Sequence, residues 1–356
     1  MMIFIYNASM KTALPSVFSF NESQWLDWLK ANSYSPNTLD YVLDYIYKSK
    51  LTANLPENFK DVILNHFQYE FPQIAEVNIS DDTTAKFLIE FKDGMQVESV
   101  LIPFNKRPTI CLSTQVGCAM NCSFCYTGTQ GLKRNLTADE VITQYLVVYD
   151  WMKKNQNKNL KPNIVFMGQG EPMHNWNEVS KAIDIFTHPK MVGLGPRQIT
   201  LSTSGYLPTI NPQELPSINY ALSLHSPFEE QRSVLIPINQ KYPLKEVITK
   251  LDQINLRPRQ FITYEYLLIK DFNMSDDHVE GLTRLLATRK AILNLIPFNP
   301  FPGSRFLRPT EQEIDEFKEK LVAKKLRVMI RTTKGDDILA ACGQLKVNKL
   351  ARKSYV

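Results

Sequence analysis

The sequence of 356 residues predicts an α/β protein built around a partial or full βα barrel. From about residue 109 onward, short apolar runs alternate with longer segments of helical spacing, which is typical of parallel strands joined by helices. Nearly every motif with small, polar or thiol side chains follows the end of such a run, where barrels place their chemistry. Residues 1–84 show helical spacing instead, so we expect a separate N-terminal helical accessory domain.

The N-terminal domain is expected to consist of short helices between about residues 18 and 70. The segment NESQWLDWLKAN begins with a helix cap, Asn21, and repeats apolar residues at Trp25, Leu26 and Leu29. SPNTLDYVLDYIYKSK and LPENFKDVILNHF have similar spacing. The run AKFLIEFKDGMQVESVLIP then predicts a β-hairpin over 85–104, because two β-rich runs flank Asp93-Gly94.

The barrel itself is expected over residues 105–335, followed by a C-terminal loop and basic tail over 336–356. Its strands are predicted at 109–114, 163–168, 198–203, 219–225, 262–269, 291–298 and 327–332. Helices are predicted between them in TADEVITQYLVVYDWMKK, WNEVSKAIDIF, PLKEVITKLDQI and DDHVEGLTRLLATR. About six such units suit a partial or full barrel.

Composition narrows the class of protein. Hydrophobic residues make up 44% and charged residues 22%, which is ordinary for a globular protein. The apolar run in the first segment, MMIFIYNASMK, is too short for a signal peptide. No apolar segment is long enough to be a transmembrane helix. We therefore expect a cytoplasmic protein with no membrane partner. The net charge of +5 and the acid-free tail KVNKLARKSYV favour a polyanionic partner, although surface lysines explain them equally well.

The cysteines are the most informative residues. Three of the five, Cys118, Cys122 and Cys125, lie in VGCAMNCSFC with the spacing C-x3-C-x2-C. Under reducing conditions such a group indicates metal or redox chemistry rather than a disulfide scaffold. Structural zinc needs four ligands, so Cys111 would have to complete such a site. Three thiolates suit an iron–sulfur cluster better, and the spacing alone leaves both open.

The cysteine motif, with Phe124 directly before its last thiol, resembles that of the radical S-adenosylmethionine (SAM) enzymes. The chain from about residue 95 to 346 resembles the RNA adenine methyltransferases of the RlmN/Cfr group. This wider resemblance lies in GQGEPMHN, STSG, ALSLHSP, LIPINQKYPL, EYLLI, NLIPFNP and DILAACGQL. It implies a partial βα barrel of the radical SAM type, a [4Fe–4S] cluster and two molecules of SAM per turnover. It also implies an external electron donor such as flavodoxin, and we expect a monomer.

The resemblance also implies a role for each site residue. The cluster would be bound by Cys118, Cys122 and Cys125. SAM would be bound by Phe124, Gly170, Glu171, Ser202, Ser223, Leu224, His225 and Asn299. Cys342 would carry the methyl group as a methylcysteine, Cys111 would be its disulfide partner, and Glu98 would accept a proton.

The residues themselves support these last three roles less strongly. Cys111 and Cys342 also fit the description of small buried apolar residues. Glu98 shares a strand face with Val100 and Ile102, and such apolar surroundings raise a carboxyl pKa toward the range of a usable base.

The substrates that the resemblance implies are adenosines of RNA. They are the adenosine in the peptidyl-transferase centre of 23S rRNA and the tRNA adenosine 3′ of the anticodon. GEPMHN and the longer match favour methylation at carbon 2 over the carbon-8 enzymes of the same family. Tyr126, where the family usually has a small residue, and the divergent N-terminal helices leave the choice of RNA open. A radical SAM enzyme for a non-RNA substrate and a zinc-stabilised RNA-binding protein without catalysis are the alternatives.

Overall fold

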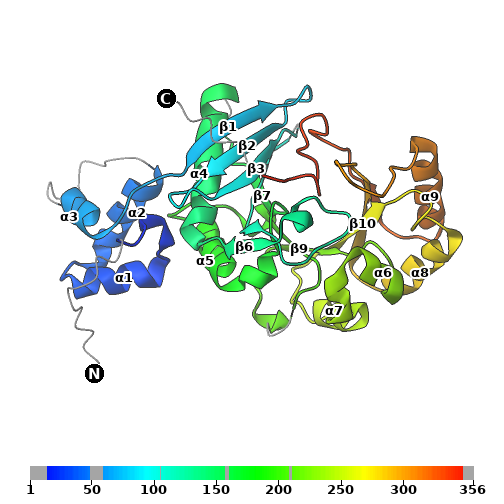
Figure 1. Ribbon diagram of the computed structural model, residues 1–356. Helices are drawn as coiled ribbons and strands as arrows, with labels where there is room; N and C mark the ends of the chain where they lie inside the picture. The colour runs from blue at the N-terminus through cyan, green and yellow to red at the C-terminus, as the bar shows by residue number, and fades with distance from the viewer. Residues whose placement is uncertain (1–13, 49–58, 105, 157–159, 208–210, 348–356) are drawn as a thin grey trace, which may run out of the picture.

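The computed structural model describes residues 14–48, 59–104, 106–156, 160–207 and 211–347. Figure 1 shows a group of N-terminal helices, a group of long antiparallel strands, and parallel strands with helices on their outer side. The basic tail after Val347 lies outside the described residues, so its contact with a polyanionic partner stays a prediction.

The N-terminal helices form a small unit around their own aromatic core. They are α1 (Glu22–Ala31), α2 (Leu39–Lys48) and α3 (Phe59–His66). Asn21 caps α1 as its sequence predicts: its side chain accepts from the Gln24 N–H at 3.0 Å, and the Gln24 side chain accepts from the Asn21 N–H at 3.0 Å. Trp25 is fully buried and packs on Phe67, with 4.8 Å between ring centroids.

The predicted hairpin is present, but it has a third strand. The hairpin strands are β2 (Ala85–Glu90) and β3 (Gln96–Ile102), and β1 (Gln73–Ile79) pairs with β2 in antiparallel fashion. The N-terminal domain expected over residues 1–84 thus also contains this strand, which lies after the helices expected between about residues 18 and 70. The side chains of β1 are all at least partly exposed, so its sequence lacks the buried alternation that indicates a strand, and pairing with β2 decides its conformation.

Ten strands form one continuous sheet. Its order is β1-β2-β3-β4-β7-β8-β9-β10-β11-β12, and all pairs from β4 onward are parallel. The parallel strands are β4 (Thr109–Cys111), β7 (Asn163–Phe166), β8 (Ile199–Thr203), β9 (Asn219–Ser223), β10 (Ile262–Leu268), β11 (Ala291–Pro297) and β12 (Val328–Ile330). Among the described strands, β1 and β12 end the sheet, so the barrel is partial, as the sequence predicts.

Helices connect the parallel strands on the outer side of the sheet (Figure 1). They are α4 (Ala138–Gln156), α5 (Trp176–Thr187), α6 (Glu229–Leu235), α7 (Leu244–Leu251), α8 (Asp276–Leu286) and α9 (Glu311–Ala323). A two-stranded ribbon, β5 (Gln115–Gly117) and β6 (Leu132–Asn135), encloses the cysteine loop. None of the helices in the described ranges is long and apolar enough to cross a membrane.

Gln144 joins the antiparallel strands to the barrel. This fully buried side chain on α4 accepts from the Ser99 hydroxyl of β3 at 2.9 Å and from the Ser113 N–H at 3.2 Å. Its amide also donates to the Ser113 carbonyl at 3.1 Å. One amide therefore holds the helix, the last antiparallel strand and the segment after β4 together.

Gln144→Leu should destabilise the chain, because it leaves the Ser99 hydroxyl and the Ser113 N–H buried without this partner. Each such group costs about 1–3 kcal/mol. We expect a lower midpoint of urea unfolding. Gln312→Leu, which removes only an exposed bond to Glu316 on α9, is the matched control and should leave the midpoint unchanged. Equal midpoints for both variants would contradict the role of Gln144.

Candidate active site

The carboxyl ends of the parallel strands open into one large pocket at the mouth of the partial barrel. Strands β7 to β11 all contribute to its wall, and its empty space is about 970 Å3, including the open entrance. Residues predicted for the site that line it are Cys118, Cys122, Phe124, Cys125, Gly170, Ser202, Ser223, His225 and Cys342. The structure therefore gathers nine predicted residues from five separate segments of the chain.

A smaller pocket of about 520 Å3 adjoins the large one, between the end of β4 and the ends of β11 and β12. Cys111 and Asn299 line this small pocket and not the large one. Cys342 lines both pockets. Its side chain therefore lies at the boundary between the three clustered thiols and Cys111.

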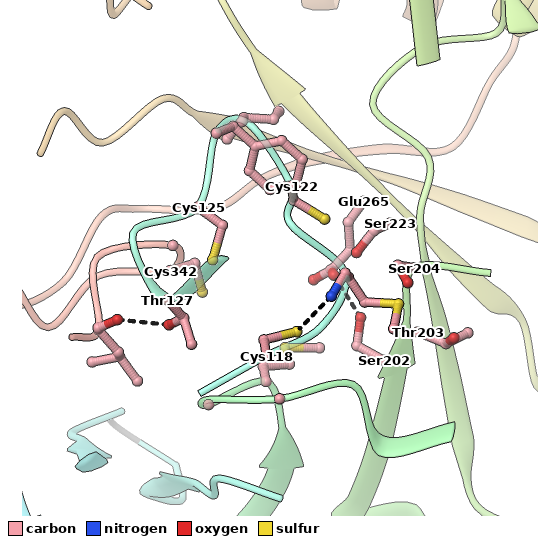
Figure 2. Close-up of a pocket in the computed structure, with 18 of the residues that line it drawn as sticks. Cys118, Cys122, Cys125, Thr127, Ser202, Thr203, Ser204, Ser223, Glu265 and Cys342 are labelled. Carbon is pink, nitrogen blue, oxygen red and sulfur yellow. Dashed lines mark hydrogen bonds between the residues drawn. The ribbon is translucent and has the colours of Figure 1, made fainter. Parts of the chain in front are cut away.

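The loop of Cys118, Cys122 and Cys125 turns its three sulfur atoms toward one space, as Figure 2 shows. Backbone hydrogen bonds shape the loop: the Cys118 N–H donates to the Gly131 carbonyl at 3.2 Å, and the Cys125 N–H donates to the Cys122 carbonyl at 3.1 Å. All five cysteines are free thiols in the structure, so the predicted disulfide is not present in this state.

The donor set fits an iron–sulfur cluster better than a single ion. Within the described part of the chain, no three His, Cys, Asp or Glu side chains converge closely enough to hold one metal ion. A four-iron cluster spans a wider space, and three soft sulfur donors around an open pocket suit it. Burial raises the pKa of Cys118 to about 12 and raises those of Cys122 and Cys125. Binding to a metal is what would keep these thiols ionised.

Glu171, one of the residues expected to bind SAM, has protein donors on both oxygens of its carboxylate. Oε2 accepts from the Ser204 N–H and hydroxyl, both at 2.8 Å, and Oε1 accepts from the Met173 N–H at 3.1 Å. The side chain lies behind the wall of the large pocket, which Gly170 lines. Gly170 has φ +103°, and a Cβ there would lie 2.6 Å from Gln115, so this position requires glycine.

His225 is buried as a neutral imidazole. Its Nδ1 accepts from the Leu267 N–H at 3.0 Å, and its ring packs edge-on against Phe124 with 4.6 Å between centroids. Burial, together with the nearby charge of Arg232, lowers the pKa of His225 to about 3. With Nδ1 occupied, the proton resides on Nε2, so the ring can donate one hydrogen bond.

Glu265 is a carboxylate of the large pocket that the sequence reasoning missed. It lies within β10, is almost completely buried and accepts from the Ser202 hydroxyl at 2.9 Å. Its Oε1 is 3.9 Å from Nη1 of Arg331, and burial raises its pKa. In the sequence, the only indication of this residue is that an acidic side chain interrupts the apolar run ITYEYLLI, since an unpaired acid is rarely buried.

Two residues predicted to bind SAM, Leu224 and Asn299, do not line the large pocket. Leu224 is fully buried outside both pocket walls, and its N–H donates to the Glu265 carbonyl at 2.9 Å. The Asn299 side-chain oxygen accepts from Arg308 and from the Thr333 hydroxyl, both at 3.2 Å.

Cys111 and Cys342 share the small pocket with the guanidinium of Arg331. Burial raises the pKa of both thiols, to about 12 for Cys111, and the charge of Arg331 partly offsets this. Nη1 of Arg331 also donates to the Met167 sulfur at 3.8 Å. Figure 2 shows Cys342 beside Cys125.

Glu98 lies beneath the C-terminal segment. Its side chain is almost fully buried, its Oε1 is 3.2 Å from the Lys86 ammonium, and its Oε2 accepts from the Lys346 N–H at 2.8 Å. Burial raises its pKa, as its apolar strand face predicts, while Lys86 opposes the shift. The carboxylate lines neither of the two pockets.

Comparisons with known proteins place this geometry among methyltransferases. The pattern of the radical SAM superfamily matches residues 112–282. The chain is 37% identical to the probable dual-specificity RNA methyltransferase RlmN of Akkermansia muciniphila, over 96% of this chain and 98% of that protein. It is 39% identical to the dual-specificity RNA methyltransferase RlmN of Lawsonia intracellularis, over 88% and 91% respectively. The solved structure of a radical SAM methyltransferase from Sphaerobacter thermophilus matches with a TM-score of 0.86 and 33% identity, over 93% of this chain and 99% of that one.

His225→Asn should change how stability depends on pH. The folded chain keeps His225 neutral down to about pH 3, whereas the unfolded chain protonates it near 6.5. The contribution of the neutral ring is therefore complete above the unfolded pKa and is lost as pH falls toward the folded one. We expect the stability difference between wild type and variant to shrink between pH 7.5 and pH 5, measured by urea unfolding. A constant difference would contradict the buried neutral state.

Proposed function

The chain belongs to the RlmN family of radical SAM RNA methyltransferases, and from this premise we propose that it methylates carbon 2 of adenosine in RNA. The relatives named dual-specificity RNA methyltransferases support RNA as the substrate class. The proposed targets are 23S rRNA at the peptidyl-transferase centre, tRNA at the adenosine 3′ of the anticodon, or both. The observation that supports this best is the position of Cys342 at the boundary between the two pockets.

We propose that Cys118, Cys122 and Cys125 hold a [4Fe–4S] cluster. When bound, the cluster would supply the electron for reductive cleavage of SAM. The rest of the large pocket offers the groups that SAM needs: the edge of Phe124, the open backbone at Gly170, and the hydroxyls of Ser202 and Ser223. His225 adds one N–H donor, and Glu171 acts by holding the Ser204 backbone in place rather than by facing the ligand.

The proposed first step takes place at Cys342. The thiolate attacks the methyl group of SAM, so the new sulfur–carbon bond forms as the sulfonium–carbon bond breaks, and S-adenosylhomocysteine leaves. A buried thiol with a raised pKa needs a nearby cation for this step, and Arg331 lies in the same small pocket. Cleavage of a second SAM would then give methionine and a 5′-deoxyadenosyl radical, which would take a hydrogen atom from the methyl group and leave as 5′-deoxyadenosine. The carbon radical would add to carbon 2, and the ring would lose one electron, back to the cluster, and the proton on carbon 2.

The proposed last steps use Glu98 and Cys111. Glu98 accepts the proton that leaves carbon 2. The Cys111 thiolate attacks the Cys342 sulfur, the sulfur–carbon bond breaks toward the methyl carbon, and that carbon takes up a proton. The resulting disulfide requires two electrons from an external donor, for which we propose a flavodoxin-like protein. Because Lys346 covers the Glu98 carboxylate, the C-terminal segment would have to shift for Glu98 to meet the base.

The remaining proposals concern the setting of the enzyme. We propose that it acts as a monomer in the cytoplasm, with the N-terminal helices and the basic tail contacting RNA phosphates. No specific feature favours the zinc-stabilised binding protein, since the clustered thiols do not converge on a single-ion site within the described residues.

Mass spectrometry of nucleosides from cells lacking the chain tests the function. We expect 2-methyladenosine to disappear from 23S rRNA, from tRNA, or from both, and to return with the wild-type chain. Cys342→Ala should not restore it, because no thiol is left to carry the carbon. Loss of 8-methyladenosine instead would move the enzyme to the carbon-8 branch, and unchanged nucleosides would refute the proposal.

Cys111→Ala should trap the enzyme on its RNA. Without the second thiol, the bond between Cys342 and the base stays unbroken, so labelled RNA should remain attached to the protein in denaturing gels until ribonuclease is added. Iron content should equal that of wild type, since Cys111 lies in the small pocket. The double variant Cys111→Ala/Cys342→Ala is the control and should show no attachment. Normal turnover by Cys111→Ala would contradict its assigned role.

A further inference from the structure

Arg232 is a fully buried arginine whose side chain meets only neutral acceptors. It lies on α6, and its exposed fraction is 0%. Its guanidinium donates to the carbonyls of Ser204 at 2.7 Å, Ser223 at 2.9 Å and Leu224 at 3.1 Å, and to the side chain of Asn239. Among the ion pairs of the described residues, none includes Arg232. These four hydrogen bonds use four of the five N–H groups of the guanidinium, and none of the acceptors carries a charge.

Burying a cation without a counter-charge is unfavourable, so the groups around Arg232 indicate the function of its charge. The exposed carboxylate of Glu229 is linked to Arg232 only through Asn239, whose amide donates to Glu229 at 2.8 Å and whose side-chain oxygen accepts from Arg232; Glu229 also accepts from the Leu244 N–H at 3.0 Å. Glu229 therefore balances the charge of Arg232 only in part, from the side of α6 away from the large pocket.

The cysteine loop is attached directly to the same helix. The Ser123 N–H donates to the Leu235 carbonyl at 3.0 Å, and the Ser123 hydroxyl donates to the Val234 carbonyl at 2.9 Å. Cys122 and Phe124 pack against the apolar group that contains Leu235. Burial lowers the pKa of Arg232, while a negative charge on Cys122 or Glu229 opposes this shift. Arg232 nevertheless keeps its charge at neutral pH.

We propose that Arg232 is the counter-charge of the iron–sulfur cluster at Cys118, Cys122 and Cys125, and that it makes this cluster easier to reduce. The inference rests on the proposed function, because it requires the cluster. A cluster with three thiolates is an anion, and reduction adds one more negative charge. A nearby buried cation stabilises the reduced form more than the oxidised form, which raises the reduction potential. The change in reduction potential can be measured without any methyl transfer by the enzyme.

The test is a redox titration of the reconstituted full chain under anaerobic conditions, followed by electron paramagnetic resonance. Arg232→Gln should shift the midpoint potential to a more negative value, because it removes the charge. Arg232→Lys keeps a charge at the same position and should remain close to wild type. Arg289→Gln, which breaks a pair with Asp252 away from both pockets, is the matched control and should have no effect.

Glu229→Gln keeps the test decisive if Arg232→Gln fails to fold or to bind iron. It removes a carboxylate that attracts the charge of Arg232, so the midpoint should shift in the opposite direction, to a more positive value. A fully loaded Arg232→Gln protein with the wild-type potential would overturn the inference and leave the proposed methyltransferase intact. An equal shift in Arg232→Lys, or a negative shift in Glu229→Gln, would also overturn it. A wild-type chain without redox-active iron would overturn the proposed cluster as well.

Discussion

The C-terminal segment lies across the barrel mouth because backbone hydrogen bonds fasten it on both sides, and the arrangement of the site depends on this. On one side, the Lys346 N–H donates to the Glu98 carboxylate at 2.8 Å. On the other, the Tyr126 N–H donates to the Gly343 carbonyl at 2.7 Å, and the Thr127 hydroxyl donates to the Leu345 carbonyl at 2.6 Å. Figure 1 shows this red segment beside β3. These bonds place Cys342 where it can face the clustered thiols and Cys111.

Tyr126 also contributes to the attachment of the C-terminal segment. Its ring stacks on Phe301 with 4.9 Å between centroids, and the Lys346 ammonium lies 4.1 Å from the ring centroid on the C-terminal segment. A large side chain is accommodated here because it faces away from the pocket that Cys125 lines. The residue thus strengthens the attachment of the C-terminal segment without occupying space next to the sulfur atoms.

Charge balance is the second constraint on the site. Burial raises the pKa of Glu98, Glu171 and Glu265, and two arginines, Arg232 and Arg331, stand close to the thiols. Each of the three carboxylates accepts hydrogen bonds from protein groups. They therefore hold neighbouring segments of the pocket in position, in addition to any contact with its interior. Glu171 bonds to the Ser204 and Met173 backbone, whereas Glu265 lines the large pocket.

The amino-acid sequence by itself determined the alternation of strands and helices and the thiol motif, because apolar periodicity and close spacing are local properties of the chain, and its resemblance to a known family implied the partial barrel. It also indicated Cys111 and Cys342 through their resemblance to a known family. The strand β1 was missed because pairing with β2, not its own residues, makes it a strand. Only the tertiary structure decided which residues face the pockets. It shows that Asn299 lines the small pocket, that Glu265 lines the large pocket and that Arg232 is buried. The sequence could not show this, because the burial and the partners of a side chain depend on segments that are far away in sequence.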